Sequence, residues 1–316
     1  MSSWSGQSKS ALPKGVVASS VTPFHADGTF NAAQVKPHID WLIEEGVAGL
    51  SPLGSAGEFF AIESEERKRV LEAAIEANDG RVPVMAGTHH YSTKITIDLS
   101  KHAEKAGADS LLIVPPFYAL PTIDGVLDHY RRIADAVSIP IVLYHNAPGT
   151  AVDLTTDHLQ MLFKEGVIAG VKMSTLMPDK IVELLQVDGP RLTVYAGIDY
   201  VAFEGLSHGA DGWISGIPSI VPSRARRLYE TIAVDGDLKS AREQWRKLAP
   251  LMRFLFGASH INRGGTAHWA GVMKAALGMI GPDVGEPLKP SAALGDGDLA
   301  TLKGLLEDLG YKLKRA

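Results

Sequence analysis

The sequence predicts an α/β protein folded as a (β/α)8 TIM barrel with a C-terminal helical extension. Three observations lead to this prediction. Short apolar runs alternate with helical patterns through most of the chain, and the runs recur at intervals of roughly 20 to 33 residues. The length of 316 residues suits one barrel with an extension. Strands that alternate with helices favour a parallel sheet, and eight such units close it into a barrel.

The expected strands are eight apolar runs rich in β-branched residues. They are residues 16–22, 49–53, 82–87, 110–114, 139–144, 168–174, 192–196 and 213–215. A helical pattern follows each of them, as in residues 32–45, 123–137 and 156–164. Pro37 predicts that the first of these helices starts late or bends, because proline removes a backbone donor.

The chain divides into three regions. Residues 1–14 are Ser-rich and lack the apolar core of a signal peptide, so we expect a loose N-terminal tail. The barrel should occupy residues 15–235. Residues 236–316 carry helical patterns near 238–256, 266–280 and 298–309, and the last has a stripe formed by Leu299, Leu302, Leu306 and Leu309. Because such a stripe must be covered, we expect this extension to pack on the barrel.

The amino-acid composition limits the kinds of partner that this protein can be expected to bind. Hydrophobic residues make up 45% of the chain and charged residues 21%, and no apolar run approaches the roughly 18 residues of a membrane helix. The net charge of -5 provides no basic footprint for nucleic acid. The absence of cysteine excludes disulfides, thiolate metal ligands and a cysteine nucleophile. We therefore expect a cytoplasmic protein with a small-molecule ligand and neither membrane nor nucleic-acid partners.

The run at residues 168–174 contains one lysine, Lys172, within an otherwise apolar strand. A strand buried on both faces normally excludes an unpaired ammonium, because removing the charge from water is costly. Lys172 is therefore either a structural ion-pair partner or a neutral amine nucleophile of the kind that forms Schiff bases with carbonyl compounds. The pattern alone leaves both interpretations open.

Function in such barrels lies where strands end, so the residues at these positions are candidates for the site. They include Thr22, Ser55, Gly57, Thr88, Tyr118, Tyr144, Lys172, Gly197 and Ile214. Tyr144 ends the strand beside Lys172, where its phenol could move protons, although a buried structural tyrosine is the alternative. The backbone N–H groups of the turn at residues 54–58, with the Ser55 hydroxyl, could hold a carboxylate.

Two charged residues outside the strands, Glu58 and Lys274, are expected to have structural rather than catalytic roles. Glu58 is expected to cap backbone donors at a helix start rather than to act as an acid or base. Lys274 lies in an apolar helical stretch, and its stem is expected to carry the ammonium to water.

A zinc-dependent aldolase would be the rival lyase mechanism. His89 and His90 are adjacent, so their side chains should diverge on an extended chain, and no histidine pair has the spacing of a helical zinc site. We therefore expect no metal and no other cofactor. A serine hydrolase using Ser55 and His145 would lack the nucleophile elbow that such enzymes use.

Taken together, several motifs resemble the pyruvate-dependent class I aldolase family typified by dihydrodipicolinate synthase and N-acetylneuraminate lyase. The motifs are Val21-Thr22-Pro23-Phe24, Gly54-Ser55-Ala56-Gly57-Glu58, Pro115-Pro116-Phe117-Tyr118, Leu143-Tyr144, Gly170-Val171-Lys172 and Gly209-Ala210-Asp211-Gly212. The resemblance covers nearly the whole barrel.

The resemblance implies a role for each matching residue. Lys172 would form a Schiff base with a 2-oxo acid, normally pyruvate, and Tyr144 would move protons at that centre. Ser55 matches a hydroxyl that links two tyrosines. Tyr118 matches the tyrosine that reaches into the neighbouring subunit, which implies a homo-oligomer, usually a dimer of dimers.

The resemblance also implies backbone contacts to the substrate. The backbone of Ser55 and Ala56, in the turn that includes Gly57, should hold the keto-acid carboxylate. Ile214 matches a position whose carbonyl faces the substrate.

Departures from the family pattern bear on the substrate. Gly149 stands where dihydrodipicolinate synthase has the arginine that binds the aldehyde's carboxylate, and Ala56 replaces a second hydroxyl. Gly197 begins a segment resembling the neuraminate lyases, but Tyr200 stands where those enzymes have a glutamate that holds sugar hydroxyls. His145 follows the catalytic tyrosine where asparagine is common, so we expect it to shape an atypical pocket.

The sequence therefore predicts a Schiff-base-forming class I lyase, an aldolase or hydro-lyase, for a 2-oxo acid. A 2-keto-3-deoxy sugar acid is favoured as substrate, and hydroxy-oxo dicarboxylates or aryl-substituted oxo acids come next. Dihydrodipicolinate synthase is the enzyme alternative. An oxo-acid-binding or regulatory protein on an aldolase scaffold is the non-enzyme alternative.

Overall fold

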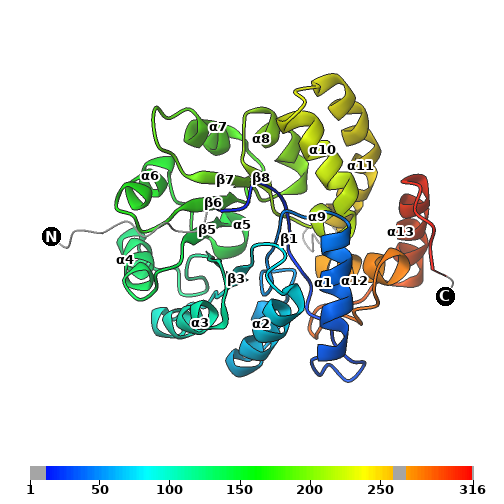
Figure 1. Cartoon of the computed structure of the whole chain (residues 1–316), viewed down its shortest axis with the longest axis horizontal. Coiled ribbons are helices and arrows are strands. Elements are labelled where there is room, and N and C mark those ends of the chain that lie inside the picture. The colour runs from blue at the N-terminus through cyan, green and yellow to red at the C-terminus, as the bar shows by residue number, and fades with distance from the viewer. Residues whose placement is uncertain (1–11, 259–267, 315–316) are drawn as a thin grey trace.

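Eight parallel strands form a nearly closed barrel surrounded by helices, as the sequence predicts (Figure 1). The structure is a computed structural model and describes residues 12–258 and 268–314. The strands are β1 (Gly15–Ala18), β2 (Gly49–Leu50), β3 (Met85–Gly87), β4 (Ser110–Ile113), β5 (Ile141–His145), β6 (Gly170–Met173), β7 (Thr193–Ala196) and β8 (Gly212–Trp213). Their order is β2-β1-β8-β7-β6-β5-β4-β3, and a parallel bridge between Leu50 and Val84 joins the two ends.

Helical segments connect the strands. They are η1 (Ala32–Gln34), α1 (Val35–Glu44), η2 (Phe59–Ala61), α2 (Ser64–Asn78), α3 (Thr93–Ala106), α4 (Ile123–Ala134), α5 (Ala147–Thr150), α6 (Thr156–Lys164), α7 (Asp179–Leu185), η3 (Asp199–Val201), α8 (Ala202–Ser207), α9 (Ile217–Ile220) and α10 (Pro222–Ala233). The first expected helix does start late: α1 begins at Val35 and places Pro37 in its first turn, where the missing N–H is not needed.

Successive side chains along each strand point to opposite faces of the sheet, so the hydrophobic core forms two clusters. Val142 and Tyr144 of β5 belong to the cluster inside the barrel, whereas Ile141 and Leu143 belong to the larger cluster between the strands and the helices. In β6, Val171 and Met173 face the helices, so Lys172 faces the interior. The period of two residues therefore places the lysine inside the barrel.

The C-terminal helices pack on the barrel, as expected. They are α11 (Leu238–Ala258), α12 (Trp269–Ile280) and α13 (Asp296–Asp308), which lie together on one side of the molecule in Figure 1. Helix α11 contacts η3, and α12 contacts α9. Leu302, Leu306 and Leu309 of the predicted stripe are buried in the core. These helices are thus in a position to contribute to the carboxyl end of the barrel.

The last residues of the predicted N-terminal tail contact the barrel, contrary to the expectation that residues 1–14 are loose. Residues 1–11 lie outside the described residues, but the Tyr195 hydroxyl donates a hydrogen bond to the Pro13 carbonyl at 2.7 Å, and Lys14 pairs with Asp211. Residues 12–14 are therefore fixed to the barrel. The start of the helix expected over residues 266–280 also lies outside the described residues, and α12 begins at Trp269.

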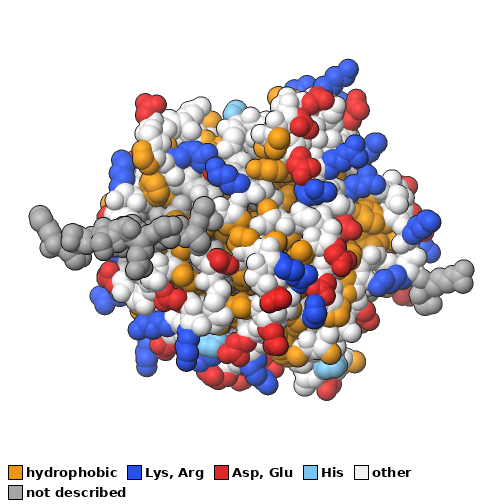
Figure 2. Space-filling view, viewed as in Figure 1, with side chains coloured by type: hydrophobic (Ala, Val, Ile, Leu, Met, Phe, Trp, Pro, Cys, Tyr) orange, Lys and Arg blue, Asp and Glu red, His pale blue; other side chains and the backbone are white. Residues whose placement is uncertain are grey.

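The charge distribution on the surface and the apolarity of the helices are relevant to nucleic-acid and membrane partners. On the face shown in Figure 2, basic and acidic side chains are interspersed without a continuous basic patch. Within residues 12–258 and 268–314, no helix is both long enough and apolar enough to cross a membrane. The exclusion of nucleic acid as a partner stays a prediction.

A buried ion pair joins the turn after β2 to the C-terminal extension. Lys274 Nζ lies 2.8 Å from Glu58 Oε2 and donates to the Glu286 carbonyl at 2.9 Å, while the Leu288 N–H donates to Glu58 Oε1 at 2.7 Å. Both side chains are almost fully buried. Burial raises the pKa of Glu58 and lowers that of Lys274, and their mutual attraction offsets part of each shift.

This arrangement corrects two expectations. Glu58 makes no side-chain capping bond at the helix it precedes, and the Lys274 ammonium does not reach water. Glu58 has a left-handed backbone with φ of 56°, which is uncommon for a residue with a Cβ atom. The pair therefore holds a strained turn in place from the far end of the chain.

We predict that Lys274→Met lowers the free energy of unfolding by about 3–5 kcal/mol, because it leaves the Glu58 carboxylate buried without its cation. Urea denaturation at pH 7 measures the loss. The raised pKa of Glu58 means that protonation relieves the defect, so the variant should regain stability as the pH falls.

The double variant Glu58→Gln/Lys274→Met is the control. It removes both charges, so it should be more stable than Lys274→Met alone. A double variant no more stable than the single one would contradict the ion-pair account.

Candidate active site

Lys172 and Tyr144 are direct neighbours across two strands at the centre of the barrel. Tyr144 of β5 and Lys172 of β6 are paired in the parallel register, and Lys172 Nζ lies 3.8 Å from the centre of the Tyr144 ring. Lys172 is 4% exposed and Tyr144 6%. The amine and the phenol are thus held in one buried space at the carboxyl ends of their strands.

The surroundings of Tyr144 favour loss of its proton. Burial by itself would raise the pKa of Tyr144, but the charge of Lys172 and hydrogen bonds with Ser55, Ser174 and Lys172 bring that pKa below its ordinary value. A phenol with a lowered pKa is suited to exchanging protons with a reacting group.

Lys172 has no carboxylate partner within the described part of the chain. The ion pairs formed by residues 12–258 and 268–314 do not include it, whereas the other buried lysine, Lys274, is paired with Glu58. Of the two interpretations left open by the sequence, the structural ion pair lacks an anion among the described residues. The geometry favours the amine nucleophile.

The turn at residues 54–58 reaches the same space. Ser55 and Ala56 line the cavity, and the Thr22 hydroxyl donates to the Gly57 carbonyl at 2.7 Å. A Cβ atom on Gly57 would lie 2.7 Å from the Leu53 nitrogen, so glycine is required by this close approach. The backbone of this turn is thereby held in place beside the cavity.

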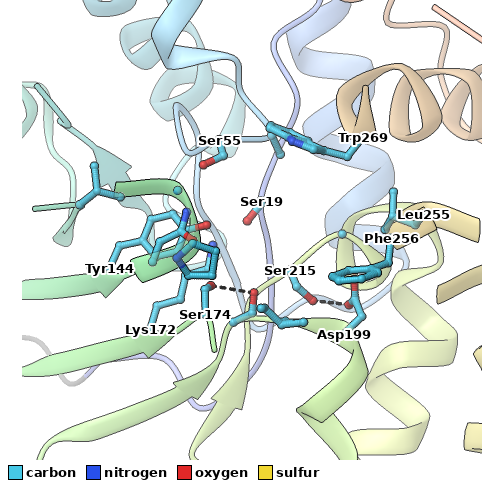
Figure 3. A pocket seen from close by; sticks show the side chains of 18 of the residues that line it. Ser19, Ser55, Tyr144, Lys172, Ser174, Asp199, Ser215, Leu255, Phe256 and Trp269 are labelled. Carbon is cyan, nitrogen blue, oxygen red and sulfur yellow. Dashed lines mark hydrogen bonds between the residues drawn. The ribbon is translucent and has the colours of Figure 1, made fainter. Parts of the chain in front are cut away.

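A cavity of about 610 Å³ opens above these residues. Strand ends supply Ser19, Tyr144, Asn146, Lys172, Ser174, Gly197 and Ser215, and the later helices supply Met252, Leu255, Phe256, Trp269 and Met273. Figure 3 shows Lys172 and Tyr144 on one side of this space and Leu255, Phe256 and Trp269 on the other. One end is therefore polar, and the other combines apolar side chains with Asp199 and Ser215.

Asp199 is the acidic residue among the described lining. It accepts hydrogen bonds from the Ser215 hydroxyl and from the Ile217 N–H, and Ser215 in turn accepts one from Trp213 Nε1 at 2.6 Å. Burial raises the pKa of Asp199 to about 6, although these hydrogen bonds oppose the shift. These hydrogen bonds hold the Asp199 carboxyl group against the segment that follows β8. Because its pKa is raised, it takes up a proton more easily than an ordinary aspartate.

The predicted substrate-binding residues divide into two groups. Ala56, Gly149 and Gly197 line the cavity. Gly57 and Ile214 are buried but are not among the residues that line it.

The structure corrects the expectation for His145. Its side chain accepts a hydrogen bond from the Leu154 N–H through Nε2 and lies 3.1 Å from Asp153, away from the cavity. As the residue next to Tyr144 on an extended strand, it faces the opposite side of the sheet. Tyr118 lies on the surface with its side chain 92% exposed and is also absent from the lining.

Some lining residues were missed by sequence reasoning although a signal was present. Ser174 lies two residues after Lys172, and Ser19 two residues after the inward-facing Val17. Strand periodicity therefore assigns both serines to the interior face. Leu255, Phe256 and Trp269 come from helices, for which strand ends provide no rule.

The two adjacent histidines do diverge. His89 is fully buried beside Tyr144, with ring centres 6.1 Å apart, and accepts a hydrogen bond from the Val114 N–H at 3.0 Å. His90 is partly exposed. Burial lowers the pKa of His89 well below its usual value, and Arg67 and Lys172 lower it further. Residues 12–258 and 268–314 contain no group of three metal-ligating side chains, and a metal-free reaction stays a prediction.

Comparisons with known proteins identify the family. Residues 12–308 match the model of the dihydrodipicolinate synthetase family. A 4-hydroxy-tetrahydrodipicolinate synthase of Pelobacter propionicus is 35% identical over 298 residues, which cover 94% of this chain and 99% of the relative.

Solved structures agree with this match. YagE, a prophage protein of the same family from E. coli K12 solved with pyruvate, is 31% identical and has a TM-score of 0.88 over 96% of this chain and 100% of its own. A monomeric dihydrodipicolinate synthase variant is 28% identical with a TM-score of 0.86, covering 95% and 97%. The chain therefore belongs to the dihydrodipicolinate synthetase family, a family of pyruvate-dependent class I lyases.

Proposed function

We propose that this protein is a class I lyase in which Lys172 forms a Schiff base with the C2 carbonyl of a 2-oxo acid. The observation that carries the proposal is the buried Lys172 amine, which lies against Tyr144 without a carboxylate partner among the described residues. A site that keeps an unpaired amine out of water incurs a desolvation cost that a purely structural role would not require.

Each group has a defined role in the proposed reaction. Lys172 Nζ attacks C2 to form a carbinolamine, and Tyr144 transfers the protons that allow water to leave and the imine to form. In the cleavage of a 4-hydroxy-2-oxo acid, the Tyr144 phenolate removes the C4 hydroxyl proton. The C3–C4 bond then breaks, an aldehyde leaves, and the electron pair forms an enamine.

Completion of the reaction returns the enzyme to its starting state. The enamine is protonated at C3, and water hydrolyses the resulting imine to release pyruvate and the Lys172 amine. Ser55 hydrogen-bonds the Tyr144 hydroxyl, and the Ser55 and Ala56 backbone would hold the carboxylate. Condensation is the reverse of this sequence, and dehydration would begin from the same imine.

On the sequence alone we favour 2-keto-3-deoxy sugar acids as substrates, followed by hydroxy-oxo dicarboxylates and aryl-substituted oxo acids. All three share the pyruvate-derived end that Lys172 would capture.

We predict that borohydride reduction in the presence of pyruvate adds a three-carbon group to Lys172, because the reduced imine can no longer be hydrolysed. Peptide mass mapping locates the adduct. Lys172→Ala should give no adduct while retaining the circular dichroism spectrum of the parent protein.

Tyr144→Phe is a second control. It should keep Lys172 but slow adduct formation and turnover by about 100-fold, the usual contribution of a positioned acid or base. If pyruvate raises the melting temperature but neither adduct nor turnover of any 2-oxo acid is found, the protein is an oxo-acid-binding protein and the lyase proposal is wrong.

Dihydrodipicolinate synthesis is a second candidate, favoured by the names of the relatives. The cavity argues against it, because Gly149 of α5 offers no side chain to bind the carboxylate of aspartate semialdehyde. We predict that the chain does not restore growth of a bacterium that lacks this enzyme and requires lysine, whereas an authentic synthase in the same vector does. Restored growth would revive this candidate.

We also propose that the protein is a homo-oligomer in which Tyr118 enters the neighbouring subunit's site. Tyr118 is 92% exposed and has a left-handed backbone with φ of 71°, and the apolar side chains of Tyr91 and Leu120 are exposed as well. An exposed aromatic side chain on a strained backbone is costly unless a partner or function requires it. The monomeric variant noted above shows that assembly must be tested for each member.

Mixing two inactive variants tests this arrangement. Tyr118→Ala and Lys172→Ala should each have strongly reduced activity, and subunit exchange between them should restore activity. The hybrid contains sites that combine Lys172 from one subunit with Tyr118 from the other. A monomer in sedimentation velocity, or no recovery after demonstrated exchange, would contradict the shared site.

A further inference from the structure

The half of the cavity across from Lys172 has an apolar wall. It consists of Phe60, Tyr200, Met252, Leu255, Phe256 and Trp269. These residues come from η2, η3, α11 and α12, so separate parts of the chain converge on one apolar surface. Figure 3 shows Trp269, Leu255 and Phe256 facing the open space from the side opposite Tyr144.

Two aromatic pairs give this apolar wall its shape. The rings of Phe60 and Trp269 are 6.3 Å apart at 75°, and those of Tyr200 and Phe256 are 5.1 Å apart at 66°. Both are edge-to-face arrangements, the geometry in which aromatic rings attract one another. Phe60 is 46% exposed and lines the cavity, so part of its ring is open to contact with a ligand there.

The charges of the cavity oppose a second carboxylate on the substrate. Among the lining residues that the structure describes, Lys172 is the only lysine or arginine, and it is committed to the imine. Asp199 would repel an anion when ionised, and burial lowers the pKa of His268, which keeps that imidazole neutral. A charged distal group would therefore lose its hydration without gaining a cation from these residues.

Three of the hydroxyl groups that line the cavity, those of Thr150, Ser174 and Ser215, are already engaged with the protein. Thr150 donates to the Asn146 carbonyl at 2.9 Å and accepts from the Val152 N–H at 3.3 Å. Ser174 donates to the Gly197 carbonyl at 3.0 Å.

Ser215 completes this pattern, because it donates to Asp199 and accepts from Trp213. Where a polyhydroxylated chain met these three hydroxyl groups and the apolar wall, it would exchange hydrogen bonds to water for contact with apolar side chains, which costs free energy.

We propose that the apolar wall is a subsite for an uncharged, planar apolar substituent at C4 of the 2-oxo acid, with an aryl group as its best occupant. The proposal rests on the proposed function, because the Lys172 imine fixes the other end of the substrate. In the cleavage direction the products are pyruvate and an aromatic aldehyde. The cavity of about 610 Å³ is larger than pyruvate alone requires. This substrate class displaces the sugar acids that the sequence alone favours.

Competition for the imine tests the subsite without requiring turnover. The intact protein is reduced with borohydride in an equimolar mixture of 2-oxo-4-phenylbutanoate, 2-oxoglutarate and 2-keto-3-deoxygluconate, and the Lys172 adducts are quantified by mass. We expect the phenyl adduct to exceed each of the others by at least about tenfold. Equal labelling, or preference for the dicarboxylate or the sugar acid, overturns the proposal.

Turnover provides the second measurement. Pyruvate release is compared for 4-hydroxy-2-oxo-4-phenylbutanoate, 4-hydroxy-2-oxoglutarate and 2-keto-3-deoxygluconate, and the phenyl compound should have the highest kcat/KM. Normal trapping of pyruvate combined with no phenyl preference refutes the subsite alone. Absence of any Lys172 adduct refutes the proposed function and, with it, this inference.

Single substitutions test whether the preference for the phenyl substrate comes from side chains of the apolar wall. Phe256→Ser should lower kcat/KM for the phenyl substrate about tenfold and leave pyruvate trapping unchanged. Phe254→Ser on the same helix is the matched control, because Phe254 is partly buried but does not line the cavity. If Phe256→Ser fails to fold, Phe60→Ser replaces an exposed ring and should show the same selective loss. Equal losses in the control and wall variants contradict the assignment.

Discussion

The structure depends on one unusual constraint: an amine is held inside a nearly closed barrel without a carboxylate partner among the described residues. Lys172 is almost fully buried against the Tyr144 ring, whereas the other buried lysine of residues 12–258 and 268–314, Lys274, is neutralised by Glu58. The contrast shows that this fold can pair a buried lysine where pairing is needed. Leaving Lys172 unpaired keeps its nitrogen available for a carbonyl carbon.

The surrounding architecture keeps that amine in place. The parallel register sets Lys172 beside Tyr144, and the alternation of side chains turns Ser174 toward the same space. On the other side, the turn containing Ser55 is fixed by the pair of Glu58 with Lys274. The C-terminal extension therefore supports the polar end of the site from behind and also supplies part of its apolar end.

The position of the residues around Lys172 was largely predictable from sequence, and the position of those at the opposite end of the cavity was not. Period-two alternation and the rule of strand ends are local, so they assigned Lys172, Tyr144 and Ser55 to the place where the cavity lies and would also have assigned Ser174 there. His145 was misplaced because its unusual identity was given more weight than its position on the outward face. Phe256 and Trp269 lie on helices far along the chain, and only tertiary packing brings them opposite Lys172.

The two ends of the cavity thus have separate origins. Strand ends supply the groups proposed for imine chemistry, and helical segments, chiefly α11 and α12, supply the surface that would select the aldehyde portion. The most direct test of the central claim is a crystal structure of the protein soaked with pyruvate. We predict continuous density between Lys172 Nζ and C2 of the ligand, with the carboxylate at the Ser55 and Ala56 backbone. Pyruvate bound elsewhere, or Lys172 paired with a carboxylate of the protein, would contradict the account.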